Sequence, residues 1–174
     1  MKLTTKQITT TAILLALAIA SQFLKNMSVY ITGSIVNLIL IMAVLFVGAG
    51  CASVIAVLTP ITSFMITGSP IMAAMPVVIP AVMVGNEVLV LTIAFLKKRH
   101  LAVRTVAAAV VKAAVMGVLI SLIIIPILGP GTSLPEKALH TARVTFSLTQ
   151  LITALIGGAL ACIIYPIVKK SSES

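Results

Sequence analysis

Charged residues are what this sequence has least of. Only 9% of its 174 residues are charged, 60% are hydrophobic, and the mean hydropathy is +1.26. A soluble domain carries roughly 25% charged residues, because its surface has to be hydrated. The scarcity of charge therefore excludes a soluble globular domain and predicts an integral membrane protein whose outer surface faces lipid.

Acidic residues, cysteine and tryptophan are also scarce or absent. The chain has three acidic residues, two cysteines and no tryptophan. Cys51 and Cys162 stand in different apolar segments without the CxxC spacing of a metal site, so we expect neither a bound metal nor a structural disulfide. HExxH, GxSxG and a pair of carboxylates are all missing, which argues against an intramembrane enzyme. We expect no catalytic residue and no cofactor.

The apolar runs predict an all-α bundle of six membrane-spanning helices, since a span needs about 20 apolar residues. The expected helices, in a single domain over residues 1–174, cover about 8–24, 30–47, 51–67, 71–96, 104–128 and 144–168. Prolines interrupt two of them: Pro60 lies in the third, and Pro76 and Pro80 lie early in the fourth. The stretch SPIMAAMPVVIP is therefore kinked or partly unwound, and the sequence leaves both possibilities open.

Basic residues indicate the orientation of the chain. The net charge of +9 does not predict a nucleic-acid partner, because the basic residues stand at the ends of apolar runs without interleaved aromatics. If the amino terminus is cytoplasmic, three basic residues, Lys25, Lys137 and Arg143, lie outside, and Lys112 lies in the membrane. The remaining ones then lie inside: Lys2, Lys6, Lys97, Lys98, Arg99, Arg104, Lys169 and Lys170. The positive-inside rule thus predicts both termini in the cytoplasm.

Small residues recur every fourth position in three of the expected helices. They are Ala12, Ala16 and Ala20 in the first, Ala109, Ala113 and Gly117 in the fifth, and Gly157 and Ala161 in the sixth. Residues four apart share one helix face, and small side chains let another backbone approach closely. Each stripe can pack inside the bundle or dock another protein.

The chain resembles the substrate-binding S component of energy-coupling factor (ECF) vitamin transporters. The likeness rests on six predicted helices in a short chain, both ends inside, the basic start MKLTTKQIT, and the spacing of Ala12, Ala16 and Ala20. The resemblance implies that these alanines dock onto a transmembrane coupling subunit, driven by two ATPases. It also implies capture of a small vitamin or precursor from outside a cell membrane, expected to be bacterial. The chain has no GxxxxGK[ST] loop of its own, so its partners would hydrolyse ATP.

Two ionisable residues fall inside expected spans, Glu87 in the fourth and Lys112 in the fifth. At 1.5 Å per residue, both lie about 12–14 Å from the cytoplasmic edge, so they can pair. Such a pair would fix the register of the two helices, or its members would contact a ligand. Asn86 adjoins Glu87 but points about 100° away around the helix.

Further polar side chains inside the spans complete the candidate binding site. Asn37, Asn86 and Gln150 suit a pocket in which a few polar groups orient a ligand, although each can equally bond another helix. Gln22 is another buried polar candidate. The candidate substrate-binding residues are therefore Asn37, Asn86, Glu87, Lys112 and Gln150.

The segment expected on the outer side of the membrane and the aromatic content of the chain indicate the kind of ligand. The segment GPGTSLPEKALHTARV is expected to be a turn-rich lid, and its basic residues steer an anionic solute or contact lipid headgroups. Aromatic residues make up only 4% of the chain, which favours a small ligand, such as pantothenate or nicotinate, over a large flat ring. The alternative function is an independent small secondary transporter with Glu87 as proton carrier.

Overall fold

The computed structural model describes residues 4–24 and 28–173, and this part of the chain is helical with no strand. The long helices are α1 (Thr5–Gln22), α2 (Val29–Phe46), α3 (Ala49–Thr67), α5 (Val78–Phe95), α6 (Leu101–Met116) and α9 (Leu148–Glu173). A π-helical segment, η1 (Gly117–Ile124), and α7 (Ile125–Leu128) extend α6. The short elements are α4 (Pro70–Ala74), η2 (Gly129–Gly131) and α8 (Glu136–Thr145). The all-α prediction is confirmed.

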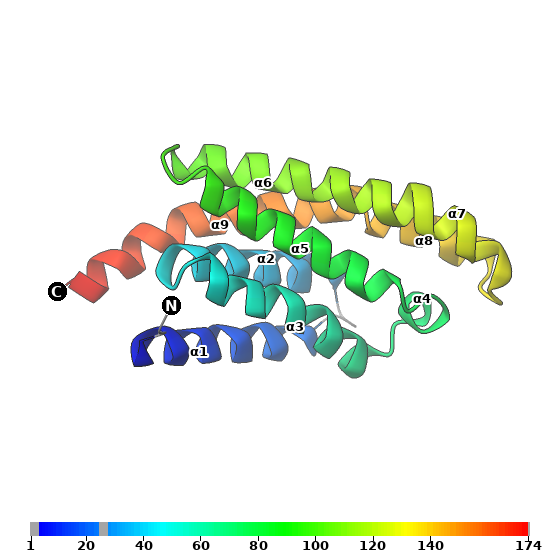
Figure 1. Ribbon diagram of the computed structural model, residues 1–174, viewed down its shortest axis with the longest axis horizontal. Helices are drawn as coiled ribbons and strands as arrows, with labels where there is room; N and C mark the ends of the chain where they lie inside the picture. The colour runs from blue at the N-terminus through cyan, green and yellow to red at the C-terminus, as the bar shows by residue number, and fades with distance from the viewer. Residues whose placement is uncertain (1–3, 25–27, 174) are drawn as a thin grey trace.

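The long helices lie roughly side by side in one elongated bundle (Figure 1). Both marked chain ends lie toward the same end of the bundle as the turn between α5 and α6, whereas α4 and α8 lie at the other end (Figure 1). The segments that carry Lys6, Lys97–Arg99 and Lys169–Lys170 are therefore gathered at one end. Lys137 and Arg143, on α8, are at the opposite end. Lys2 and Lys25 lie outside the described residues.

Five helical stretches in the described part of the chain are long and apolar enough to cross a membrane. They cover 29–46, 49–67, 78–95, 101–131 and 136–170. The expected first span forms α1, which packs against α2 and α3 but begins with the polar turns TKQITTT. The protein is a multi-pass membrane protein, while the sixth crossing and the cytoplasmic termini stay predictions.

Proline and capping residues set where the helices begin and end. Thr4 forms a capping box with Gln7 at the start of α1, which satisfies free backbone N–H groups there. The expected fourth helix is broken: α4 ends at Ala74, and α5 begins only at Val78, after Met75–Val77. Pro76 lies in this break, so the stretch SPIMAAMPVVIP is interrupted rather than merely kinked.

The segment GPGTSLPEKALHTARV is less rich in turns than the sequence predicted. Its second half forms α8, with Glu136 in the first turn and Arg143 in the last. These charges oppose the helix dipole and stabilise both ends. Pro135 could have predicted the start of this helix from the sequence, because proline is compatible with the beginning of a helix but not with its interior.

The three small-residue stripes have different surroundings. On α9, Gly157 and Ala161 are buried against the bundle, and on α6, Ala109 is buried too. Gly157 packs on the α2 backbone, so this stripe allows α2 and α9 their close contact. On α1, by contrast, Ala12, Ala16 and Ala20 are all exposed at the outer surface.

We predict that Gly157→Ala destabilises the bundle. A Cβ at this position would lie 2.8 Å from both the Leu38 nitrogen and the Ser34 carbonyl oxygen, and backbone atoms cannot yield locally. The free energy of unfolding should fall by about 1–3 kcal/mol, measured by denaturant titration in detergent. Gly50→Ala in α3 is the control, because its Cβ would enter open space. Equal stability of the two variants would contradict close packing of α2 on α9.

Candidate functional site

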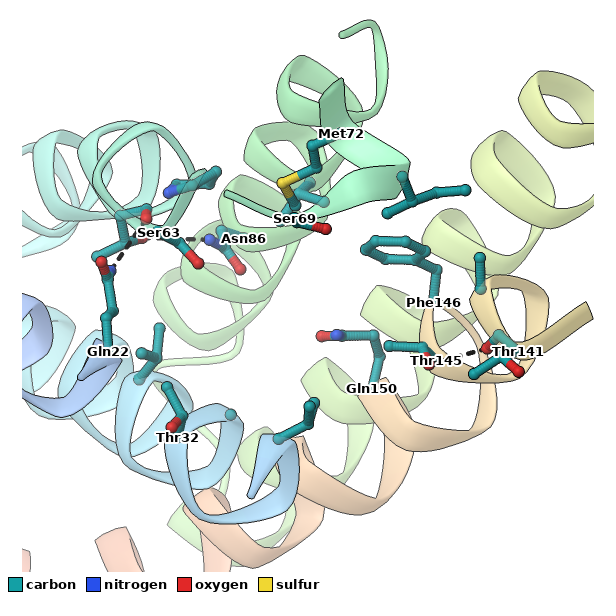
Figure 2. A pocket seen from close by; sticks show the side chains of 18 of the residues that line it. Gln22, Thr32, Ser63, Ser69, Met72, Asn86, Thr141, Thr145, Phe146 and Gln150 are labelled. Atoms are coloured by element: carbon teal, nitrogen blue, oxygen red, sulfur yellow. Dashed lines mark hydrogen bonds between the residues drawn. The ribbon is translucent and has the colours of Figure 1, made fainter. Parts of the chain in front are cut away.

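A cavity of about 420 Å³ lies in the half of the bundle that is distant from the chain termini. Its wall is built from the halves of α1, α2, α3 and α5 that lie away from the chain termini. The last part of α6 and the start of α9 also contribute. Residues of α4 and α8 complete the wall near its outer end. Figure 2 shows Gln22 and Thr32 on one side of the hollow, Gln150 pointing in from the opposite side, and Met72 and Phe146 at its border.

Lys112 lies at the deep end of this cavity and is only 2% exposed. Its Nζ donates hydrogen bonds to Asn37 Oδ1 at 2.6 Å and to Asn86 Oδ1 at 2.8 Å. A lysine inside a membrane protein is costly unless polar groups surround the ammonium. Two amide oxygens, one from α2 and one from α5, provide these groups and bind both helices to α6.

Pro60 explains why Asn86 is oriented in this way. Proline has no N–H, so Pro60 leaves the carbonyl of Ala56, four residues earlier in α3, without its helical hydrogen bond. Asn86 Nδ2 donates to this carbonyl at 3.2 Å and to Thr59 Oγ1 at 3.4 Å. The opposite end of the amide, Oδ1, then faces Lys112. The carbonyl freed by Pro60 thus meets protein rather than lipid.

Further hydrogen bonds extend this group into a polar network across the bundle. Asn37 Nδ2 donates to Thr153 Oγ1 of α9 at 3.3 Å, and Gln22 Nε2 of α1 donates to the Thr59 carbonyl at 3.0 Å. Side chains or carbonyls from all six long helices therefore take part. Buried polar groups of this kind specify one packing arrangement, because any other leaves them without partners.

The structure brings together four of the five candidate binding residues. Asn37, Asn86, Lys112 and Gln150 line the cavity, whereas Glu87 is not among its described lining residues. The expected pair of Glu87 with Lys112 is not formed. Glu87 Oε2 instead accepts a hydrogen bond from Ser53 of α3 at 2.8 Å. The turn of about 100° between neighbouring helix positions directs Asn86, not Glu87, toward Lys112.

Several lining residues were not selected from the sequence. Thr59, Ser63 and Ser69 contribute hydroxyl groups, and Met72 contributes an apolar side chain. Hydroxyl residues are common in membrane helices and often bond their own backbone, so composition gives no signal for them. Thr59 could have been selected from the sequence, because it directly precedes Pro60. A proline in a membrane span predicts polar contacts nearby.

The arrangement is suited to binding rather than to covalent chemistry. The wall combines apolar side chains with amides, hydroxyls and one ammonium group, as small-molecule pockets do. Within the described residues, no three His, Cys, Asp or Glu side chains lie close enough to hold a metal ion. The fold and the cavity together are those of a membrane protein with a pocket that suits a small solute.

The comparison with known families agrees with this class. Residues 6–169 match the family described as the ECF transporter, substrate-specific component, so the chain belongs to that family. The resemblance noted from the sequence is thereby confirmed. No curated protein and no solved structure matches the chain. Members of this family are the substrate-binding subunits of transporters, which is not a catalytic role.

We predict that Asn86→Leu destabilises the protein more than Glu87→Gln. The first substitution removes an acceptor from Lys112 and the donor from the Ala56 carbonyl, while the second keeps an acceptor for Ser53. Unpartnered buried groups cost about 1–3 kcal/mol each, so Asn86→Leu should lower the thermal midpoint in detergent clearly. If Glu87→Gln were the more harmful change, the expected pairing of Glu87 with Lys112 would regain support.

Proposed function

We propose that this protein captures a small water-soluble vitamin or vitamin precursor and hands it to a separate transport module. The observation that carries this proposal is the cavity: it is ligand-sized and ends at the polar group around Lys112. Beyond that group, toward the chain termini, the bundle is filled by a close-packed apolar core that includes Ala52, Ala108 and Ala161. A ligand can be held at this depth, and the described core on its far side is packed with apolar side chains.

The proposed orientation places the cavity on the outside of a bacterial cell membrane. The end of the bundle with the termini carries the basic segments, and the positive-inside rule assigns such an end to the cytoplasm. The cavity lies in the other half, where it would meet solutes outside the cell. α4 and α8 border it there and are short, so they are the elements best placed to move when a ligand enters.

The coupling partner is proposed to dock on α1. Ala12, Ala16 and Ala20 are exposed and form one face of this helix, with Ile13 and Leu17 exposed beside them. Neither of the other two stripes is exposed along its length in this way. A shallow apolar face of this kind allows a partner helix to approach closely. The partner would be a transmembrane coupling subunit driven by two ATPases.

The alternative, a secondary transporter with Glu87 as proton carrier, has less support. Glu87 is turned toward Ser53 on α3 and lies away from the cavity wall. A proton carrier for a bound solute would have to communicate with that solute. The following experiment distinguishes this alternative from the proposed capture function.

We expect ATP-dependent uptake only when the chain is reconstituted together with its coupling subunit and ATPases. Proteoliposomes containing the chain alone should bind radiolabelled pantothenate or nicotinate without accumulating it, because a packed apolar core lies beyond the cavity in the described structure. Accumulation driven by a proton gradient in the chain-alone vesicles, and its loss in Glu87→Gln, would establish the secondary-transport alternative instead.

We predict that Ala16→Leu separates binding from transport. The larger side chain fills the shallow face of α1, so uptake and co-purification of the coupling subunit should fall at least tenfold, while ligand affinity stays unchanged. Ala159→Leu is the matched control, because Ala159 is an exposed alanine on α9, away from α1. Normal uptake by Ala16→Leu at wild-type expression would refute docking on this stripe.

A further inference from the structure

The cavity contains a cation without an acidic partner. Among the described residues that line it, Lys112 is the one with a charged side chain. The chain has only three acidic residues. Glu87 bonds Ser53, Glu136 lies in the first turn of α8, and Glu173 is the last residue of α9. The Lys112 ammonium is therefore surrounded by neutral dipoles in an apolar bundle, where an added anion gains strong Coulombic attraction.

The hydrogen bonds of Lys112 leave room for one more acceptor. A lysine ammonium has three protons, and two of them are donated to Asn37 Oδ1 and Asn86 Oδ1. Both amides are held in this orientation by partners on other helices, Thr153 for Asn37 and the Ala56 carbonyl for Asn86. Among the described residues no third acceptor binds this ammonium, and Lys112 is part of the cavity wall.

A second polar group in the cavity wall, the side-chain oxygen of Gln22, lacks a hydrogen-bond donor. Gln22 is 2% exposed, and within the described structure its Oε1 is a buried atom that accepts no hydrogen bond. The amide cannot be turned over without loss, because Nε2 must face the Thr59 carbonyl at 3.0 Å. A buried acceptor without a donor is costly, and Gln22 lines the cavity. It therefore requires a donor from a molecule inside the cavity.

We infer that the substrate is a small monoanionic acid that also carries a neutral O–H or N–H donor. This inference rests on the proposed function and specifies its ligand. The carboxylate accepts the third proton of Lys112 and neutralises the charge, while the hydroxyl or amide donates to Gln22 Oε1. The donor is neutral because the described wall offers no acid to balance a second cation. The cavity of about 420 Å³ lies in the size range of small-molecule pockets and limits the ligand to a small molecule.

The test compares acids with analogues in which a neutral alcohol or amide replaces the carboxylate. Binding to the detergent-purified full chain is measured by calorimetry for pantothenate against its alcohol, pantothenol, and for nicotinate against nicotinamide. Pantothenate has both required features, whereas nicotinate has the acid but no neutral donor. We expect pantothenate to bind more tightly than nicotinate, and more tightly than pantothenol by on the order of a hundredfold, as for loss of one partner of a buried charge pair.

Two variants examine the residues themselves without removing the lysine. Asn37→Asp supplies a resident anion of nearly the same shape, and the Thr153 hydroxyl can donate to it. The acid should then lose at least tenfold in affinity and the preference over the alcohol should disappear. Ala102→Asp, exposed at the start of α6, adds the same charge away from the cavity and should change nothing. Gln22→Leu should weaken binding of the donor-bearing acid roughly tenfold.

The outcomes distinguish this inference from the proposed function. Equal or tighter binding of pantothenol than of pantothenate overturns the inference and leaves ligand capture intact. An unchanged preference for the acid in Asn37→Asp overturns it as well. Absence of binding by all four compounds, together with no small molecule co-purifying by mass spectrometry, counts against the proposed capture function itself.

Discussion

The structure depends on how a lysine is accommodated in the middle of an apolar bundle. Lys112 is nearly inaccessible, and the two amide oxygens that hold it come from different helices. Asn37 and Asn86 can do so only while their own amide groups are engaged elsewhere, with Thr153 and with the Ala56 carbonyl. In lipid there is little hydrophobic force between helices, so such directional contacts and close packing decide how they associate. One cation thereby fixes the relative positions of α2, α5 and α6.

This constraint also divides the bundle into two halves of different character. Toward the chain termini, small residues such as Ala43, Ala56 and Ala154 let the helices pack without space between them. Toward the other end, the helices are held apart around the cavity, and its border is made by α4 and α8. The break between α4 and α5 at Pro76 matters here. An uninterrupted helix would continue straight along α5, whereas the break lets α4 turn and pack near α8.

Composition and periodicity were sufficient for the helical class and for most helix positions. Four of the five candidate residues line the cavity, because a polar side chain inside a span faces either a polar partner or a cavity, while their role in binding stays a prediction. The predicted pairing of Glu87 with Lys112 was wrong, because the depth of a residue in the membrane does not show which face of its helix it occupies. Two residues at equal depth meet only if they share a face, and Asn86 occupies that face. α8 was missed because its polar sequence is typical of a loop, and its packing beside the cavity is a tertiary effect.

α1 shows how one helix can serve two surfaces at once. Gln22, its last residue, points into the cavity and bonds α3, while Ala12, Ala16 and Ala20 lie on its exposed face. Its sequence is the least apolar of the long helices in the described structure, which suits a face that meets protein rather than lipid. A ligand that bonds Gln22 would act on the end of the helix whose outer face is proposed to dock the coupling subunit. α1 is one continuous helix, so the same element carries both a residue of the cavity wall and the alanine face.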